Sequence, residues 1–177
     1  MRQPINVPYI VDNLWEWQRP DGYPNRRFSI FASPTPDLAI ASAGEGKIPY
    51  RVELMGRFKL CQMKCSSAFK DNNDSKYHPD CRKLREKLLK KLDPTWLDVD
   101  LDQKAKIGRL WMPCLRKEEV AFLFESENVL RKIRDEIVDN ITYWRDAVLI
   151  KDADSLHNKN GEIFFEPLDG YWLRPLP

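Results

Sequence analysis

Four residues of the types that bind zinc lie close together in the sequence. They are Cys61, Cys65, His78 and Cys81, in the pattern Cys-x3-Cys-x12-His-x2-Cys. Thiolate and imidazole ligands in this number suit tetrahedral zinc, although structural zinc sites usually contain the tighter Cys-x2-Cys turn. Cysteine is also a common small core residue. A structural zinc ion is therefore an alternative interpretation of this cluster and not the favoured one.

A second group of residues surrounds a predicted strand at 28–32. Arg26 and Arg27 precede the strand, and Ser33 and Thr35 follow it in a turn that leads into a predicted helix. A turn of small hydroxyl residues lets a ligand approach the backbone closely. The N-terminus of the next helix offers unpaired N–H groups and the positive end of the helix dipole, and both suit a pyrophosphate. A neighbouring arginine adds a bidentate phosphate contact.

The order of these residues resembles the core of the ADP-ribosyltransferase superfamily. In that family an aromatic residue and a Ser-x-Ser/Thr element end one strand, a short helix with a buried Leu-Ala pair follows, and a Tyr-x-Val strand comes next. The matching residues here are Phe31, Ser33-Pro34-Thr35, Leu38-Ala39 and Tyr50-x-Val52. The resemblance covers about residues 5–60. It implies an ADP-ribosyltransferase-like α+β fold, cleavage of the nicotinamide–ribose bond of NAD, and transfer of ADP-ribose to a protein or a nucleic acid.

The resemblance also implies roles for single residues. Ser33 would be catalytic, together with a late glutamate at the start of a strand. Glu119 stands directly before the apolar segment 120–124 and fits that description, although Lys117 occupies a place where the family often has Glu or Gln. Glu162 and Glu166 are the alternative glutamates. The residues implied in NAD binding are Tyr9, Arg26, Arg27, Ser29 and Thr35.

A competing hypothesis is a binding module without enzymatic activity, stabilised by zinc or not. Residues 57–91 contain eleven Lys or Arg against four acids. The predicted helix in this segment has Leu84, Leu88 and Leu92 on one face and basic residues on the other. Such a face can follow a phosphate backbone or bind a protein partner, although a charged face is more often simply solvated.

The elements that must position these residues can be read from the periodicity of the chain. Strands are predicted at 5–11, 28–32, 49–54, 120–124, 147–150 and 162–166. Helices are predicted at 36–43, after Pro79-Asp80 with Leu84, Leu88 and Leu92 on its apolar face, and at 126–144. Thr35 and Asp80 are the expected N-caps, and Gly44 follows the first helix. Residues 66–77 read as a loop and 93–106 as irregular. Strands at both ends with helices between them favour α+β with mixed or antiparallel sheets.

Length and composition suit one folded domain. The chain has 177 residues, a net charge of +2, 42% apolar residues and 32% charged residues. We predict a single domain over 1–177, with a basic helical insertion at about 61–106. No apolar run approaches the roughly 18 residues of a membrane span, and no export signal is recognisable. We therefore expect a cytoplasmic protein with reduced cysteines and no membrane partner.

The setting expected from the resemblance is that of an intracellular toxin or phage effector. It would have a macromolecular acceptor and an inhibitory partner protein. Several other enzyme signatures are absent from the sequence, namely the glycine-rich phosphate loop, GxGxxG, HExxH and GxSxG.

Overall fold

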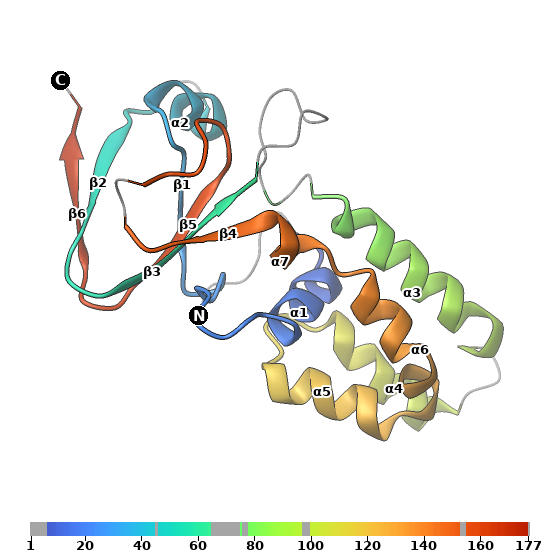
Figure 1. Ribbon diagram of the computed structural model, residues 1–177. Coiled ribbons are helices and arrows are strands. Elements are labelled where there is room, and N and C mark those ends of the chain that lie inside the picture. Colours follow the sequence, from blue (N-terminus) through green and yellow to red (C-terminus); the bar gives the residue numbers. More distant parts are fainter. Residues whose placement is uncertain are drawn as a thin grey trace. The chain divides into compact units, whose positions relative to one another are not determined.

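The chain divides into two compact units in a computed structural model of the protein (Figure 1). The structure describes residues 7–44, 46–64, 75, 78–96, 100–152 and 155–176, and for 93–96 and 103 only the backbone. The helical unit contains the described residues up to Arg19 together with His78–Trp144. The sheet unit contains the described residues between Pro20 and Tyr77 and those from Arg145 onwards. The single domain expected from the sequence stays a prediction.

The helical unit is built around helix α1. Its helices are α1 (Tyr9–Trp17), α3 (Asp80–Trp96), α4 (Leu101–Gly108), α5 (Lys117–Ser126) and α6 (Asn128–Asp139), with a 3-10 turn at Arg109–Trp111. Helix α1 contacts α3, α5 and this 3-10 turn. The predicted apolar face of α3 is confirmed, because Leu84, Leu88 and Leu92 are all buried.

The sheet unit contains two antiparallel sheets. Its strands are β1 (Ile30–Ala32), β2 (Tyr50–Leu54), β3 (Phe58–Met63), β4 (Ala147–Ile150), β5 (Ile163–Pro167) and β6 (Tyr171–Pro175). Four of them form a sheet in the order β1-β5-β3-β4, and β2 pairs with β6 in a two-stranded ribbon. The fold is therefore α+β with antiparallel sheets, as the sequence predicted at this level. The strands predicted at 28–32, 49–54, 147–150 and 162–166 are confirmed as β1, β2, β4 and β5.

Helix α2 (Pro36–Ala43) has the bounds expected from the sequence. The Oγ1 atom of Thr35 accepts the backbone N–H of Leu38 at 3.4 Å, so Thr35 is the N-cap. Pro36 occupies the first helical position, and Gly44 follows the helix with a φ of 92°. Because these signals are all local, the sequence alone was sufficient to place this helix.

Two predicted strands are helices instead. The strand predicted at 5–11 is wrong from Tyr9 onwards, where α1 begins, and residues 5 and 6 lie outside the described residues. The strand predicted at 120–124 lies within α5. Val120, Leu123 and Phe124 are buried, which is helical spacing, but the exposed Phe122 completes an apolar run that looks like a strand. Short apolar runs do not distinguish buried helix from buried strand.

The helix predicted at 126–144 is also interrupted. Helix α6 ends at Asp139, and a short helix α7 (Tyr143–Asp146) follows. The backbone N–H groups of Thr142 and Tyr143 donate to the carboxylate of Asp80, at 3.0 Å each. Asp80 is itself the first residue of α3 and not a residue before it, so its predicted role as N-cap is wrong. The 93–106 segment is not irregular throughout, because it contains the end of α3 and most of α4.

The described helices are too short or too polar to span a bilayer. Of the predicted loop 66–77, only Ser75 lies within the described residues.

Candidate functional site

The turn before β1 holds two consecutive arginines in fixed positions. The side-chain Oδ1 of Asn25 accepts the backbone N–H of Arg27 at 2.9 Å. The hydroxyl of Ser29 donates to the backbone carbonyl of Asn25 at 2.8 Å. These bonds close the turn on itself, as Asn and Ser side chains commonly do. Ser29, a predicted NAD contact, therefore shapes the turn that carries Arg26 and Arg27.

Both arginines are buried. The exposed fraction is 9% for Arg26 and 4% for Arg27. The guanidinium carbon of Arg26 lies 5.4 Å from the ring centroid of Phe31, and that ring stacks on Phe164 of β5. A cation over an aromatic face is stabilised electrostatically, more strongly where water is excluded. Phe31 thus links the arginine turn to the sheet.

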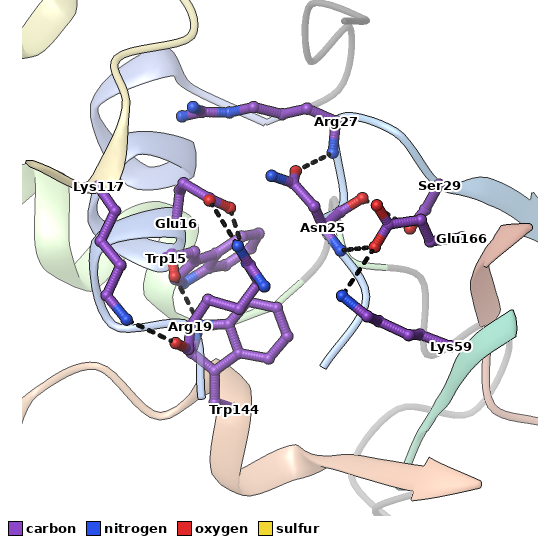
Figure 2. Close-up of polar contacts among 10 residues, drawn as sticks. All are labelled: Trp15, Glu16, Arg19, Asn25, Arg27, Ser29, Lys59, Lys117, Trp144 and Glu166. Atoms are coloured by element: carbon purple, nitrogen blue, oxygen red, sulfur yellow. Dashed lines mark hydrogen bonds and ion pairs between the residues drawn. The ribbon is translucent and has the colours of Figure 1, made fainter. Parts of the chain in front are cut away.

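Glu166 lies at the same end of β1 as the arginines. Its Oε2 accepts the backbone N–H of Asn25 at 3.1 Å and lies 3.6 Å from the Nζ of Lys59 on β3 (Figure 2). The carboxylate thus connects β5, β3 and the arginine turn. This alternative catalytic glutamate contacts two positively polarised groups, both of which stabilise its charged form.

Ser33 and Glu162 flank the opposite end of the same strand pair. Strands β1 and β5 are antiparallel, and their pairing ends with Ala32 opposite Ile163. If this register is continued by one residue beyond Ala32 and Ile163, Ser33 lies opposite Glu162. The two ends of β1 are separated by four residues from Ser29 to Ser33, about 13 Å at roughly 3.3 Å per residue.

Glu162 is positioned by a polar network at the start of β5. Its Oε2 accepts the backbone N–H of Ser75 at 3.1 Å and also the Ser75 hydroxyl. The backbone N–H of Met63 donates to the carbonyl of Glu162 at 2.9 Å, which continues the β3–β5 ladder. Glu162 is half-buried. It therefore has the position expected of the late glutamate, at the start of a strand.

The loop before Glu162 is held by two side-chain amides. Gln62, fully buried on β3, donates to the carbonyl of Asn158 at 2.7 Å and accepts its N–H at 3.1 Å. Asn158 donates to the Met63 carbonyl at 2.9 Å and accepts the N–H of Gly161 at 2.5 Å. A Cβ added at Gly161 would lie 1.9 Å from the Met63 carbonyl oxygen. Only glycine fits at position 161, because the chain there passes so close to the Met63 carbonyl. Sequence reasoning missed Gln62 and Asn158, because their partners are distant in the chain.

Glu119 has a different role from the one expected. It lies in the first turn of α5 in the helical unit, not before a strand, so the expected context is wrong. Its Oε2 accepts the backbone N–H of Arg116 at 2.8 Å, the reciprocal half of a capping box. The Nη2 atom of Arg109 lies 3.8 Å from the Oε1 atom of Glu119. Hydrogen bonding to Arg116 and these positive charges lower the pKa of the Glu119 carboxyl from its ordinary value. The carboxylate thus stabilises a helix terminus.

Tyr9 and Arg19 also belong to the helical unit. Tyr9 is the first residue of α1 and is exposed, so its predicted place in a first strand is wrong. Arg19 forms two contacts of 3.1 Å with the carboxylate of Glu16, and its carbonyl accepts the Nζ of Lys117 at 3.1 Å (Figure 2). Ser33 and Arg26 belong to the sheet unit, so the predicted NAD-binding residues divide between the two units.

The predicted zinc ligands also divide between the units. Cys61 is fully buried on β3 of the sheet unit, and burial raises the pKa of its thiol to about 12. His78 and Cys81 lie at the start of α3 in the helical unit. The Nδ1 atom of His78 accepts the backbone N–H of Asp80 at 3.2 Å.

A complete zinc site is not visible among the described residues. They contain no cluster of three or more His, Cys, Asp or Glu side chains suited to a metal ion. Cys65 lies outside the described residues. Structural zinc stays an alternative prediction, which metal analysis of the purified protein tests.

Helix α3 presents the predicted basic face. Lys87 and Lys91 each lie 3.0 Å from the carboxylate of Glu136 on α6. The remaining basic residues of this face are exposed and form no ion pair with any described residue: Arg82, Lys83, Arg85 and Lys90. Part of the face is therefore neutralised within the helical unit, and part carries charge available to a partner.

The chain matches no protein-family profile, and no curated protein or solved structure shows significant similarity to it. The candidate function consequently depends on the geometry of the chain's own residues.

Proposed function

We propose that the sheet unit binds NAD and transfers its ADP-ribose to a macromolecular acceptor, a protein or a nucleic acid. One observation carries the proposal. The β1–β5 register ends with Ala32 opposite Ile163, so Ser33, which follows β1, and Glu162, which precedes β5, flank the same end of the strand pair. A hydroxyl turn and a strand-start carboxylate on neighbouring strands are the two parts that the resemblance to ADP-ribosyltransferases requires.

The proposal assigns the catalytic carboxylate to Glu162 instead of Glu119. Glu119 is committed to the N-terminus of α5 and lies in the other unit. Glu166 contacts Lys59 and the arginine turn at the far end of β1. Glu162 lies in the same unit as Ser33 and Thr35, and Gly161 before it is held closely against Met63. A rigid support of this kind keeps a reacting carboxylate in position.

In the proposed reaction the bond between ribose C1′ and the nicotinamide nitrogen breaks, and its electron pair stays with nicotinamide. Positive charge develops on the ribose, and the Glu162 carboxylate stabilises that charge. The acceptor nucleophile then bonds to C1′ and loses its proton to Glu162 or to water. The Ser33 hydroxyl, which has no hydrogen bond within the described residues, would orient the ribose. Arg26 and Arg27 lie one strand length away and are buried, so either would have to expose its side chain to bind phosphate.

Nicotinamide release from NAD by the purified protein tests this proposal. We expect turnover in the wild type and a fall of about 100-fold or more in Glu162→Gln, because general-base and electrostatic roles contribute at least that much. Glutamine retains an oxygen that can accept the Ser75 bonds. Glu119→Gln is the matched control and should retain turnover. Absence of both NAD binding and turnover in the wild type would overturn the proposal, whereas full activity in Glu162→Gln would overturn the residue assignment alone.

A second candidate function is nucleic-acid binding by the basic face of α3, without catalysis. The observation that favours it is the set of exposed basic side chains with no ion pair among the described residues, exemplified by Lys83 and Arg85. The double substitution of Lys83 and Arg85 by Gln should weaken binding to duplex and single-stranded oligonucleotides alike, because phosphate contacts carry no information on strandedness or sequence. If the wild type and the double variant bind the oligonucleotides with equal affinity, the basic face of α3 is not the nucleic-acid-binding surface.

A further inference from the structure

The β2–β6 ribbon has one face that does not pack on the sheet unit's core. Val52 and Leu54 of β2 pack against the core residues Leu60, Ile150, Ile163 and Phe165. Successive side chains of a strand point to opposite faces, so Arg51 and Glu53 lie on the other face. The register brings Arg174 opposite Arg51 and Trp172 opposite Glu53. We call these four side chains, Arg51, Glu53, Trp172 and Arg174, the outer face of the ribbon.

The outer face exposes a large aromatic ring among charged groups. Trp172 is 59% exposed, and the side chain of Arg174 is 64% exposed. Arg51 is exposed as well. An indole ring in this position carries a large apolar surface that solvates poorly.

The charges of the outer face do not balance. Arg51 lies directly opposite Arg174, and like charges at directly opposite positions destabilise a strand pair. Glu53 relieves part of this repulsion, because its Oε2 lies 2.5 Å from the Nε of Arg174. Arg51 forms no ion pair with any residue that the structure describes, which leaves one positive charge beside the exposed ring. An anionic partner would remove the remaining repulsion.

We infer that the outer face binds single-stranded nucleic acid, with a base stacked on Trp172 and a phosphate on Arg51. Arg51 and Trp172 are diagonal neighbours across the strand pair, which places their Cα atoms about 7–8 Å apart. Both side chains are long enough to reach one nucleotide from there. Stacking on an exposed ring combined with guanidinium–phosphate contacts is the usual chemistry of single-strand binding, and it tolerates any base.

A duplex fits this face less well, because its bases are stacked on one another and the indole ring cannot reach them. A folded protein fits less well too, because protein interfaces centre on several apolar anchors, whereas here Trp172 is the single apolar side chain among four. The inference goes beyond the proposed function, since single-strand binding at this face requires no NAD turnover.

Fluorescence anisotropy with labelled 12-nucleotide strands, alone and annealed to their complements, tests the inference. We expect the wild type to bind the single strand more tightly than the duplex. Trp172→Ala should weaken single-strand affinity about fivefold or more, and Trp172→Phe should restore most of it, because stacking of one base contributes on that scale. Arg51→Gln should weaken binding and lower the slope of log affinity against log salt by about 0.7.

The controls are matched in residue type and placed elsewhere. Phe122→Ala removes an aromatic ring that is 62% exposed on α5, and Arg134→Gln removes an exposed arginine on α6. Both should leave affinity unchanged. Tighter binding of duplex than of single strand, equal affinity in wild type and Trp172→Ala, or no binding of either oligonucleotide would each overturn the inference. A loss seen only in the α3 double variant would assign the binding to α3 instead.

Discussion

The indole N–H of Trp15 donates to the carboxylate of Asp80 at 2.9 Å, although the two residues are 65 positions apart in the chain. The same carboxylate accepts the hydroxyl of Thr142 at 2.8 Å and the backbone N–H groups of Thr142 and Tyr143, where α7 begins. Asp80 is 1% exposed. One carboxylate therefore joins α1, α3 and the start of α7 inside the helical unit.

Removal of that carboxylate should destabilise the helical unit strongly. Asp80→Ala leaves the buried donors of Trp15, Thr142 and Tyr143 without an acceptor, and we expect a loss of about 4 kcal/mol in the free energy of unfolding. Asp80→Asn should lose only about 1 kcal/mol, because its amide can still accept the N–H groups and donate to the Thr142 hydroxyl. Urea denaturation measures both.

The control for Asp80 is Asp102→Ala. Asp102 forms an exposed ion pair with Lys106 at 2.8 Å within α4, and its removal should change stability by less than about 0.5 kcal/mol. Equal stability of Asp80→Ala and Asp102→Ala would show that the Asp80 contacts do not form in solution.

The Glu119 cap should stabilise the protein only where its carboxyl is ionised. Contacts with Arg116 and Arg109 lower its pKa below the ordinary value of 4.5. The stabilisation is then present above about pH 4.5 and is lost as the pH falls through the folded-state pKa. Glu119→Ala should lose about 0.5–1 kcal/mol of unfolding free energy at pH 7, and the difference from wild type should disappear at low pH. If the unfolding free energies of wild type and Glu119→Ala differ by the same amount at every pH, the stabilisation does not depend on the charge of Glu119.

Gly161 and Gly108 should respond oppositely to substitution by alanine. A Cβ at Gly161 would overlap the Met63 carbonyl, so Gly161→Ala should destabilise the sheet unit by about 3 kcal/mol. It should also lower NAD turnover by displacing Glu162. A Cβ at Gly108 meets no atom within 4 Å, and Gly108→Ala should stabilise the protein by about 0.5 kcal/mol. Thermal unfolding of both variants provides the comparison, and a stable Gly161→Ala protein would contradict the close approach of β3 to the 158–161 loop.

Alkaline pH should destabilise the protein partly through Cys61. Burial raises the pKa of this thiol from 9.0 to about 12 in the folded state. Below pH 9 the thiol is protonated in folded and unfolded chains alike. Above pH 9 the unfolded chain ionises first, so stability should fall by about 1.4 kcal/mol per pH unit from this group until about pH 12. Cys61→Ala should lower stability at neutral pH through the lost packing but show a shallower fall above pH 9. If stability falls equally steeply with pH in wild type and in Cys61→Ala above pH 9, the Cys61 thiol is accessible to water in the folded protein.

Local sequence signals were sufficient to predict much of the secondary structure. Thr35, Pro36 and Gly44 fixed the bounds of α2, and the leucine spacing fixed the buried face of α3. Helix α5 was missed because the exposed Phe122 completes an apolar run that looks like a strand, and α1 was missed because its polar residues are buried along with its apolar ones. Every described residue of α1 from Ile10 to Trp17 is buried. Strand β3 was missed because Lys59 and Gln62 interrupt its apolar residues, and the hydrogen bond that permits a buried Gln62 is made with Asn158, 96 positions away.

The sequence alone identified the candidate residues of the site, but it did not predict which of them lie at the same end of the strand pair. The sequence marked Ser33, Arg26, Arg27 and three candidate glutamates by their places beside predicted strands and by the resemblance to a family. The choice of Glu162 depends on a register between residue 30 and residue 165, which no local pattern encodes. Glu119 was preferred because its apolar neighbours resembled a strand, and the error in secondary structure led directly to the error in its expected context.

The order of segments in the two units has a consequence for dissection of the protein. Helix α1 lies before the first part of the sheet unit, and the other helices of the helical unit, α3 to α6, lie between β3 and β4. The chain thus leaves and re-enters each unit, and no single cut releases either one whole. A ribosome must also synthesise the chain beyond residue 145 before β3 can meet β4, so the helical unit has all of its sequence available first. A truncation from the N-terminus would remove α1 from the helical unit, and one from the C-terminus would remove β6 and then β5 from the sheet unit. A fragment that contains one whole unit would require its two segments to be rejoined by a designed linker.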